Sequence, residues 1–256
     1  MLCGHGAADQ YVRRYVTSAA DTANAEDLFG DTATPQVVLI GTSNSDPAYN
    51  FGGFLSEYLQ TEVLNVATAG GGMDGAMLAY LPSPEFQNSP PRVLVWEVQT
   101  YHNLADARFH RQALPLLDNG CEGRAAALES RQQLHVGRNE VLFNGGGRVR
   151  DLKSEDHFID LKFSDTSIRK LDAVVWFTNG RKEHVRLTRE EVLTPNGRFV
   201  FGLRTDAEWG EQVFMSMDVV IPPEVESRPS LRTRLCAYEA EPATANRTAK
   251  LEGTHR

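Results

Sequence analysis

Residues 36–47 read QVVLIGTSNSDP, and this stretch decides the first half of the fold. The apolar run 36–40 ends at Gly41, which is typical of a buried strand. A small polar loop follows, and within residues 49–60 the aromatic and aliphatic side chains recur at helical spacing. A strand, a tight polar turn and a helix are therefore predicted in this order.

The same order continues along the chain. Residues 63–66 and 92–98 are apolar runs that predict two further strands, and residues 74–81 predict a helix between them. Strands and helices that alternate over short connections predict a parallel sheet with helices on its faces. Three strands alone leave unpaired edges, so we expect this α/β sheet, within residues 1–120, to be part of a larger domain.

Beyond Cys121 the pattern changes. Residues 122–133 predict one helix, and short runs of alternating polarity follow it. Asn179-Gly180 and the turn 195–197 separate some of these runs. We therefore predict an all-β domain, an antiparallel β-sandwich, over residues 121–240 and a disordered polar tail over 241–256. The predicted strands are 158–163, 173–177, 183–187, 198–203, 213–220 and 231–238.

Charge is distributed unevenly along the chain. The net charge is −8; up to Cys121 there are 5 Lys and Arg against 13 Asp and Glu, and the remainder is balanced. A solvated surface of mixed charge is the simplest interpretation, but an Arg-rich neutral module could also meet a polyanion. No apolar run reaches the roughly 18 residues of a membrane span, and the first residues lack the features of a signal peptide.

Ser43 lies where the first predicted strand turns into a helix. A nucleophile at this point has a fixed position, and backbone N–H groups of the turn can stabilise an oxyanion. The alternative is that Ser43 only caps the turn. Ser45 and Asp46 compete for the same role, although Asp46 precedes Pro47 and is expected to be a helix cap.

A glycine-rich loop, Gly70–Gly72, follows the second predicted strand. Glycine lets the backbone approach a ligand and offer it an N–H group, and the alternative is a flexible turn. No Gly-Lys-Ser/Thr follows, so the loop is not a phosphate-binding loop. None of the seven histidines stands in an acid–x–His setting that identifies a base for the serine, and Glu155–His157 predicts a surface turn.

Trp176, Thr178, Arg181 and Lys182 cluster on a predicted hairpin. An aromatic face beside cations could stack on a sugar ring and pair with its carboxylate. The alternative places Trp176 in the core and leaves the two cations in solvent. No Cys or His spacing matches a zinc site, and we expect neither a metal nor another cofactor.

Residues 27–98 resemble the AlgX family of alginate biosynthesis proteins. The resemblance is carried by GTS at the strand end, by the strand NSPPRVLVWE (88–97) and by the spacing of Cys121 and Cys236. The family consists of periplasmic alginate O-acetyltransferases in which an SGNH-hydrolase-like domain precedes a carbohydrate-binding module. The resemblance implies that this chain corresponds to the C-terminal part of such a protein.

The resemblance also implies roles for single residues near the first loop. Ser43 matches the serine that carries the acetyl group, and Tyr49 matches an aromatic residue near the active site. The amide groups near Ser43 and Gly71 would then hold the oxyanion. The family's Asp-x-His, which activates the serine, lies upstream of everything in this chain, so we expect Ser43 to be without its base here. The family tends to have tyrosine a few residues after Trp-Glu, where this chain has Tyr101-His102, and a His102 that points into the site would alter substrate contacts.

In the second half, Cys121 and Cys236 match a disulfide of the family, and Cys3 matches one half of another. The Trp176 hairpin falls where the family's module contacts the polymer. Three functions stay open: O-acetylation of alginate, binding of alginate without turnover, and deacetylation by an SGNH-type esterase. The expected partners are alginate (polymannuronate) and other proteins of the alginate-secretion complex in the periplasm, with no nucleic acid and no transmembrane segment.

Overall fold

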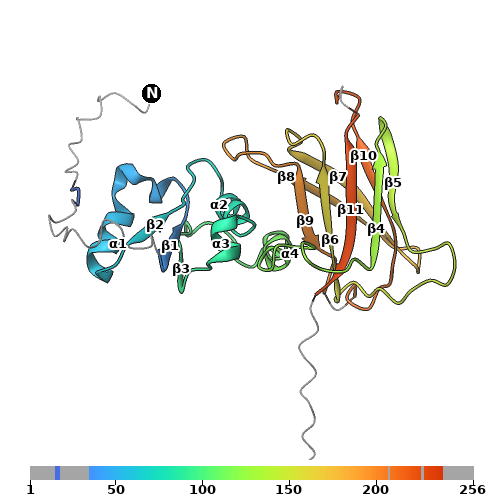
Figure 1. Ribbon diagram of the computed structural model, residues 1–256, viewed down its shortest axis with the longest axis horizontal. Helices are drawn as coiled ribbons and strands as arrows, with labels where there is room; N and C mark the ends of the chain where they lie inside the picture. The colour runs from blue at the N-terminus through green and yellow to red at the C-terminus, as the bar shows by residue number, and fades with distance from the viewer. Residues whose placement is uncertain (1–14, 18–34, 207, 226–227, 239–256) are drawn as a thin grey trace, which may run out of the picture. The chain divides into compact units, whose positions relative to one another are not determined.

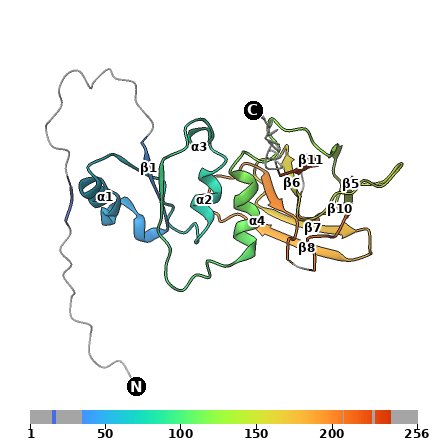
Figure 2. The ribbon, with the colours of Figure 1, turned by 90° about the horizontal axis from the view of Figure 1, so that it is seen from below.

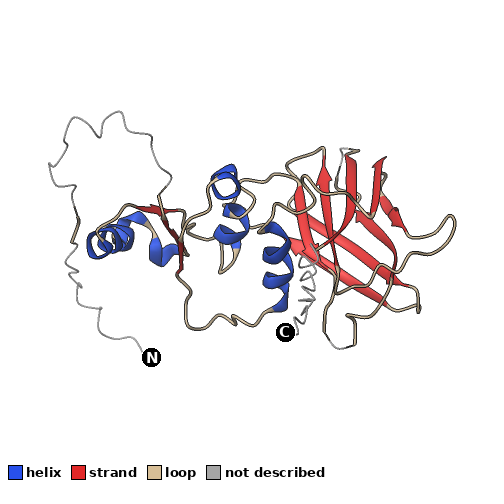
Figure 3. Ribbon diagram, turned by 60° about the horizontal axis from the view of Figure 1, so that its bottom comes forward, coloured by secondary structure: helices blue, strands red, loops and turns tan. Residues whose placement is uncertain are grey.

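The computed structural model describes residues 15–17, 35–206, 208–225 and 228–238. Cys3 and the predicted tail 241–256 lie outside these residues. By its internal contacts the chain forms two compact units, one of Met1–Asn119 with Thr188–Pro195 and one of Gly120–Leu187 with Asn196–Arg256. Figure 3 shows that helices belong to the first unit and the large sheets to the second. No helix among the described residues is both long and apolar enough to cross a bilayer.

The first unit is built on a parallel sheet of three strands, as predicted, and their order in the sheet is β2-β1-β3. Its central strand β1 (Val37–Ile40) consists of four apolar residues, and all four are buried. The flanking strands β2 (Val63–Asn65) and β3 (Val93–Trp96) are mostly half-buried. Central position and burial on both faces explain why β1 reads as a continuous apolar run rather than as an alternating one.

Helices connect and flank these strands. The predicted helices are α1 (Phe51–Leu59), which packs beside β2 in Figure 1, and α2 (Gly75–Tyr80). Two more, α3 (Pro84–Asn88) and α4 (Ala107–Leu116), were not predicted. The segment Thr188–Pro195 also belongs to this unit: a methyl group at Gly75 would come within 2.9 Å of the Leu193 side chain, so glycine permits this close approach.

The second unit is the predicted antiparallel sandwich (Figure 2). One sheet has the order β5-β10-β7-β8 and the other the order β4-β11-β6-β9. Apolar side chains from both sheets form one core cluster between them. The strands are β4 (Leu128–Gln133), β5 (Gly137–Phe143), β6 (His157–Phe163), β7 (Lys170–Phe177), β8 (Lys182–Thr188), β9 (Arg198–Gly202), β10 (Phe214–Ile221) and β11 (Ser230–Ala237).

The helix predicted over 122–133 is wrong. Leu128–Gln133 is strand β4, which pairs antiparallel with β11, and its side chains alternate between half-buried and exposed. The segment is rich in Glu, Arg and Gln, which favour helices, but pairing with a strand about 100 residues away overrides this local preference. Strand β5 was not predicted either.

Candidate functional site

The carboxyl edge of the parallel sheet gathers the candidate nucleophile and its neighbours. The chain passes from β1 to β2 on one side, and then crosses to β3 on the other side of β1. The carboxyl ends of β1 and β3 therefore meet at a topological switch point, where open α/β sheets bind their ligands. Ser43 is here: it begins the 3₁₀ helix η1 (Ser43–Ser45), two residues after Gly41, and it is exposed.

Glu97, the residue after β3, organises this edge. Its backbone N–H donates to the Ile40 carbonyl at 2.8 Å, which sets the glutamate beside the end of β1. Its Oε2 accepts hydrogen bonds from the Thr42 backbone N–H at 2.8 Å and the Thr42 hydroxyl at 2.9 Å. The Ser45 hydroxyl donates to Oε2 at 3.3 Å, and the Asn44 amide lies 3.5 Å from Oε1. One carboxylate therefore holds the residues on both sides of Ser43.

The approach of this carboxylate requires glycine at position 41. A methyl group there would lie 2.8 Å from Glu97 Oε2 and 2.7 Å from the Ser45 hydroxyl oxygen. Burial acts to raise the pKa of the Glu97 carboxyl, but hydrogen bonds from Thr42, Asn44 and Ser45 outweigh it and hold the pKa below its ordinary value. The group is therefore an ionised acceptor at neutral pH, which suits donors that converge on it.

The three polar candidates in this loop are now distinguishable. Ser45 is fully buried and its hydroxyl is bonded to Glu97. Asp46 accepts from the Ala48 N–H at 2.8 Å and caps the 3₁₀ helix η2 (Pro47–Tyr49), which confirms the predicted cap. Ser43, in contrast, is an exposed residue. Among these three, Ser43 is thus the residue that can meet a substrate.

The other predicted neighbours make hydrogen bonds within their own loops. The Gly71 N–H donates to the Thr68 carbonyl at 3.1 Å, and Tyr49 stands on η2 with 68% of its surface exposed. The His102 Nε2 lies 3.2 Å from the Gln99 Oε1. None of the hydrogen bonds described for residues 35–206 joins Ser43 to a histidine. His157, predicted in a surface turn, is instead buried at the start of β6, where its Nδ1 lies 2.7 Å from the Lys153 carbonyl.

The four candidate sugar-binding residues of the hairpin do not form one cluster. Trp176 lies on the outward side of β7 and is half-buried, because its neighbours Val175 and Phe177 face the core. Lys182 Nζ is 5.4 Å from the centre of the Trp176 ring. Thr178 is exposed at the turn, whereas Arg181 faces a different ring, that of Trp209, at 5.6 Å.

Two residues that were not predicted complete the surroundings of Trp176. Arg138 on β5 lies 5.4 Å from the ring centre, and the indole N–H donates to Asp218 on β10 at 2.8 Å. Arg138 and Asp218 also form an ion pair with each other. We call Trp176, Arg138 and Lys182 the Trp176 platform: an aromatic ring with two cations near it, on the solvent side of one sheet.

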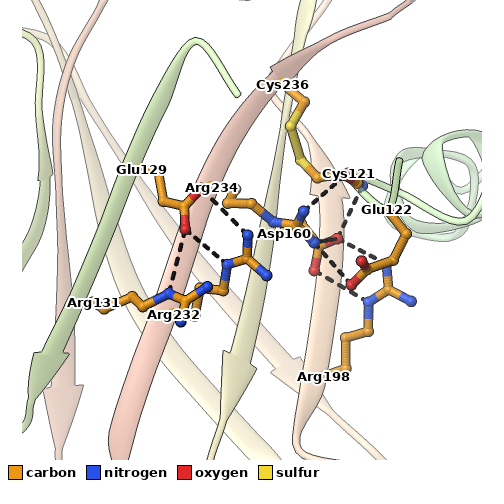
Figure 4. Close-up of polar contacts among 9 residues, drawn as sticks. All are labelled: Cys121, Glu122, Glu129, Arg131, Asp160, Arg198, Arg232, Arg234 and Cys236. Carbon is orange, nitrogen blue, oxygen red and sulfur yellow. Dashed lines mark hydrogen bonds and ion pairs between the residues drawn. A yellow bond between two sulfur atoms is a disulfide. The ribbon is translucent and has the colours of Figure 1, made fainter. Parts of the chain in front are cut away.

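The second unit contains the disulfide that the family resemblance implies. Cys121 and Cys236 are bonded, with their Cα atoms 5.9 Å apart. Figure 4 shows the polar contacts around it: the buried Asp160 accepts from the Cys121 N–H at 3.0 Å and from Arg198 at 2.7 and 3.1 Å. Arg234 donates to the Cys121 carbonyl at 2.8 Å. Within the described residues, no group of three or more His, Cys, Asp or Glu side chains could hold a metal ion.

Comparison with known families identifies both units. A family model described as an SGNH hydrolase-like domain, acetyltransferase AlgX, matches residues 3–100. A second, described as a C-terminal carbohydrate-binding module, matches residues 120–249, which is half of the chain. The chain belongs to the AlgX family of alginate biosynthesis proteins.

Individual relatives agree with this assignment. The chain is 40% identical over 247 residues to the alginate biosynthesis protein AlgX of Pseudomonas aeruginosa, covering 96% of this chain and 51% of the relative. It is 42% identical over 226 residues to AlgX of Azotobacter vinelandii, covering 88% and 47%. It is also 44% identical to the probable alginate O-acetylase AlgJ of Pseudomonas fluorescens over 87 residues, which cover 34% of this chain and 22% of AlgJ. The chain thus spans about half the length of the AlgX relatives it matches.

A solved structure shares the fold. The solved structure of P. aeruginosa AlgX matches this chain with a TM-score of 0.75 at 40% identity. The match covers 80% of this chain and 49% of that one. The fold of this chain, a parallel α/β sheet followed by an antiparallel carbohydrate-binding module, is therefore that of its family.

Proposed function

We propose that this chain supplies the acyl-carrying serine and the polymer-binding module of an alginate O-acetyltransferase. The observation that carries the proposal is the position of Ser43. Ser43 is exposed at the carboxyl end of the central strand, and the residues on either side of it, Thr42 and Asn44, are held by Glu97. A fixed backbone and a free hydroxyl are what nucleophilic catalysis requires, since misplacement by about 1 Å can cost about a hundredfold in rate.

The proposed reaction has two steps. In the first, the Ser43 hydroxyl oxygen attacks the acetyl carbonyl of a donor, a base takes the hydroxyl proton, and the donor's leaving group departs with a proton. In the second, a hydroxyl of a mannuronate residue attacks the acetyl-serine, and the Ser43 oxygen recovers a proton as the ester bond to the sugar forms. We assign the base to a histidine outside the described residues. The Gly71 N–H is a proposed oxyanion donor, which requires that it release the Thr68 carbonyl.

The Trp176 platform is the proposed polymer-binding site of the second unit. An indole face packs against the apolar face of a sugar ring, and flanking cations pair with the uronate carboxylate. Arg138 and Lys182 lie at equal distances, 5.4 Å, from the ring and are both exposed. Thr178 and Arg181, at the adjacent turn, are proposed to contact neighbouring sugars. The disulfide fits an oxidising compartment such as the periplasm, where proteins of alginate secretion are the proposed partners.

The proposal is tested by turnover of a chromogenic acetyl ester. Because the base is assigned outside the described residues, the assay uses this chain and also a chimera that adds the part of P. aeruginosa AlgX that the chain does not match. Ser43→Ala should abolish acetyl release in the chimera, while Ser167→Ala, at an exposed serine of the other unit, should leave it unchanged. Equal turnover with and without the Ser43 hydroxyl would reject the proposed catalytic role, and alginate binding without turnover would then be the remaining function. Transfer to water but not to oligomannuronate would indicate an esterase.

A further inference from the structure

The outward face of the sheet β4-β11-β6-β9 carries a row of four basic residues, one on each strand. Arg131 on β4 is paired in register with Arg232 on β11, Arg232 with Lys162 on β6, and Lys162 with Arg198 on β9. Their neighbours along the strands, such as Leu161 and Phe199, are fully buried in the core, so the basic side chains occupy the opposite face. We call these four residues the basic row.

Like charges directly opposite each other destabilise a sheet. Here basic residues are placed opposite each other in three successive strand pairings, from β4 to β9. The cost is partly offset where Arg198 turns to the buried Asp160, with which it forms two hydrogen bonds, and only 12% of its side chain is exposed (Figure 4). Arg198 is therefore held by Asp160 and is hardly accessible to a ligand.

The remaining three cations are accessible, and two of them share one acid. Glu129 accepts from Arg232 at 2.9 and 3.3 Å and from Arg131 at 3.4 Å, as Figure 4 shows. The side chains of Arg131 and Arg232 are 68% and 32% exposed. Lys162 is exposed, and none of the ion pairs formed among the described residues includes it. With Arg198 and Arg234 included, five cations lie among three carboxylates, those of Glu122, Glu129 and Asp160, which leaves an excess of two positive charges in a protein of net charge −8.

We propose that the basic row is a second polyuronate-binding surface, separate from the Trp176 platform, which lies on the other sheet. Adjacent strands are about 4.8 Å apart, so the three accessible cations span about 10 Å in a line across the strands. A linear polymer with one carboxylate on each sugar can place successive charges along such a line. Guanidinium groups bind carboxylates through paired N–H donors, which favours a carboxylate polymer as the ligand. The choice of a polyuronate rests on the proposed function.

The test is calorimetric titration of the full chain with an oligomannuronate at low ionic strength. A neutral oligosaccharide of the same length controls for stacking, and heparin controls for polyanion binding in general. The variant Arg131→Gln/Lys162→Gln removes two exposed charges. Its matched control is Arg148→Gln/Arg150→Gln, which removes two exposed charges from a loop of the same unit. Both are also made in a Trp176→Ala background, which separates the two surfaces.

The proposal predicts that Arg131→Gln/Lys162→Gln weakens oligomannuronate binding about fivefold or more, in both backgrounds, and that the loop control does not. It also predicts an unchanged or higher Tm, because the substitution relieves repulsion within the sheet. The proposal is overturned if the basic-row variant binds like the wild type, if the loop control loses as much, or if heparin binding depends on the row as strongly. Loss of all binding by Trp176→Ala alone would reject the basic row and leave the proposed function intact, whereas no binding by either surface would reject polymer binding itself.

Discussion

Replacing Glu97 with glutamine probes the contact on which the active-site proposal depends. The carboxylate accepts three hydrogen bonds on Oε2 and lies within reach of a fourth donor on Oε1. Glutamine has one carbonyl oxygen and one NH₂ group, so in either orientation a donor faces a donor. The substitution also removes the charge that strengthens these bonds. Hydrogen bonds to charged groups contribute about 1.5–3 kcal/mol each, and because the site is only half-buried we expect a loss of about 2–3 kcal/mol in total.

The effect on catalysis should exceed the effect on binding. The donors affected are on Thr42, Asn44 and Ser45, the residues around Ser43, so the nucleophile moves while the sugar-binding unit is untouched. In the chimera we expect kcat for acetyl-ester turnover to fall about tenfold to a hundredfold with KM nearly unchanged. Glu97→Asp keeps the charge and should recover part of kcat. Glu85→Gln, at an exposed glutamate on α3, is the matched control.

The same variant predicts a pH dependence of stability. The pKa of Glu97 is lowered in the folded state, so the unfolded chain binds more protons in the acidic range and stability rises with pH there. The contribution is fully present above the ordinary pKa of about 4.3 and is lost as pH falls through the lowered value. The difference in unfolding free energy between wild type and Glu97→Gln should therefore shrink below about pH 4. A Glu97→Gln protein with wild-type kcat and the same stability at pH 7 would refute the reasoning.

The remaining predictions concern packing, the buried ion pair and the polymer site. Gly41→Ala forces a methyl group against the glutamate carboxylate and should cost about 1–3 kcal/mol and most of the turnover, whereas Gly147→Ala, which meets no atom within 4 Å, should cost neither. Asp160→Asn removes the buried carboxylate that pairs with Arg198 and, together with Glu122, with Arg234, and should lower the free energy of unfolding by about 3 kcal/mol in urea titrations; a loss no larger than that of the exposed Asp156→Asn would contradict this. Trp176→Ala should weaken oligomannuronate binding about tenfold, and an unchanged affinity would remove the ring from the binding site.

The sequence predicts those strands whose own residues are enough to favour a strand. β1, β3 and the β7–β8 hairpin are recognisable because apolar runs, alternation and Asn179-Gly180 act locally. β4 is not recognisable, because its residues favour a helix and only the distant partner β11 makes it a strand. The same limit applies to the sheet-face patterns, since the basic row exists only through the register of four strands.

The candidate site shows a similar division. Ser43 follows from the strand–turn–helix pattern, because the pattern itself places the residue. Glu97 reads only as a polar residue within the predicted strand 92–98, and its role appears when β3 is paired parallel to β1. The rule that parallel strands end at one edge could have indicated it. Arg138 and Asp218 reach Trp176 from other strands, and no spacing in the sequence connects them.

The most direct test of the central claim is to trap the acyl-enzyme. The chimera is incubated with an activated acetyl ester, quenched in acid and digested, and the acetyl group is located by mass spectrometry. The proposed function predicts an acetyl group on Ser43 that forms within the turnover time, disappears on addition of oligomannuronate and is absent from Ser43→Ala. Acetylation of another residue with full turnover, or turnover that survives the loss of Ser43, would contradict it.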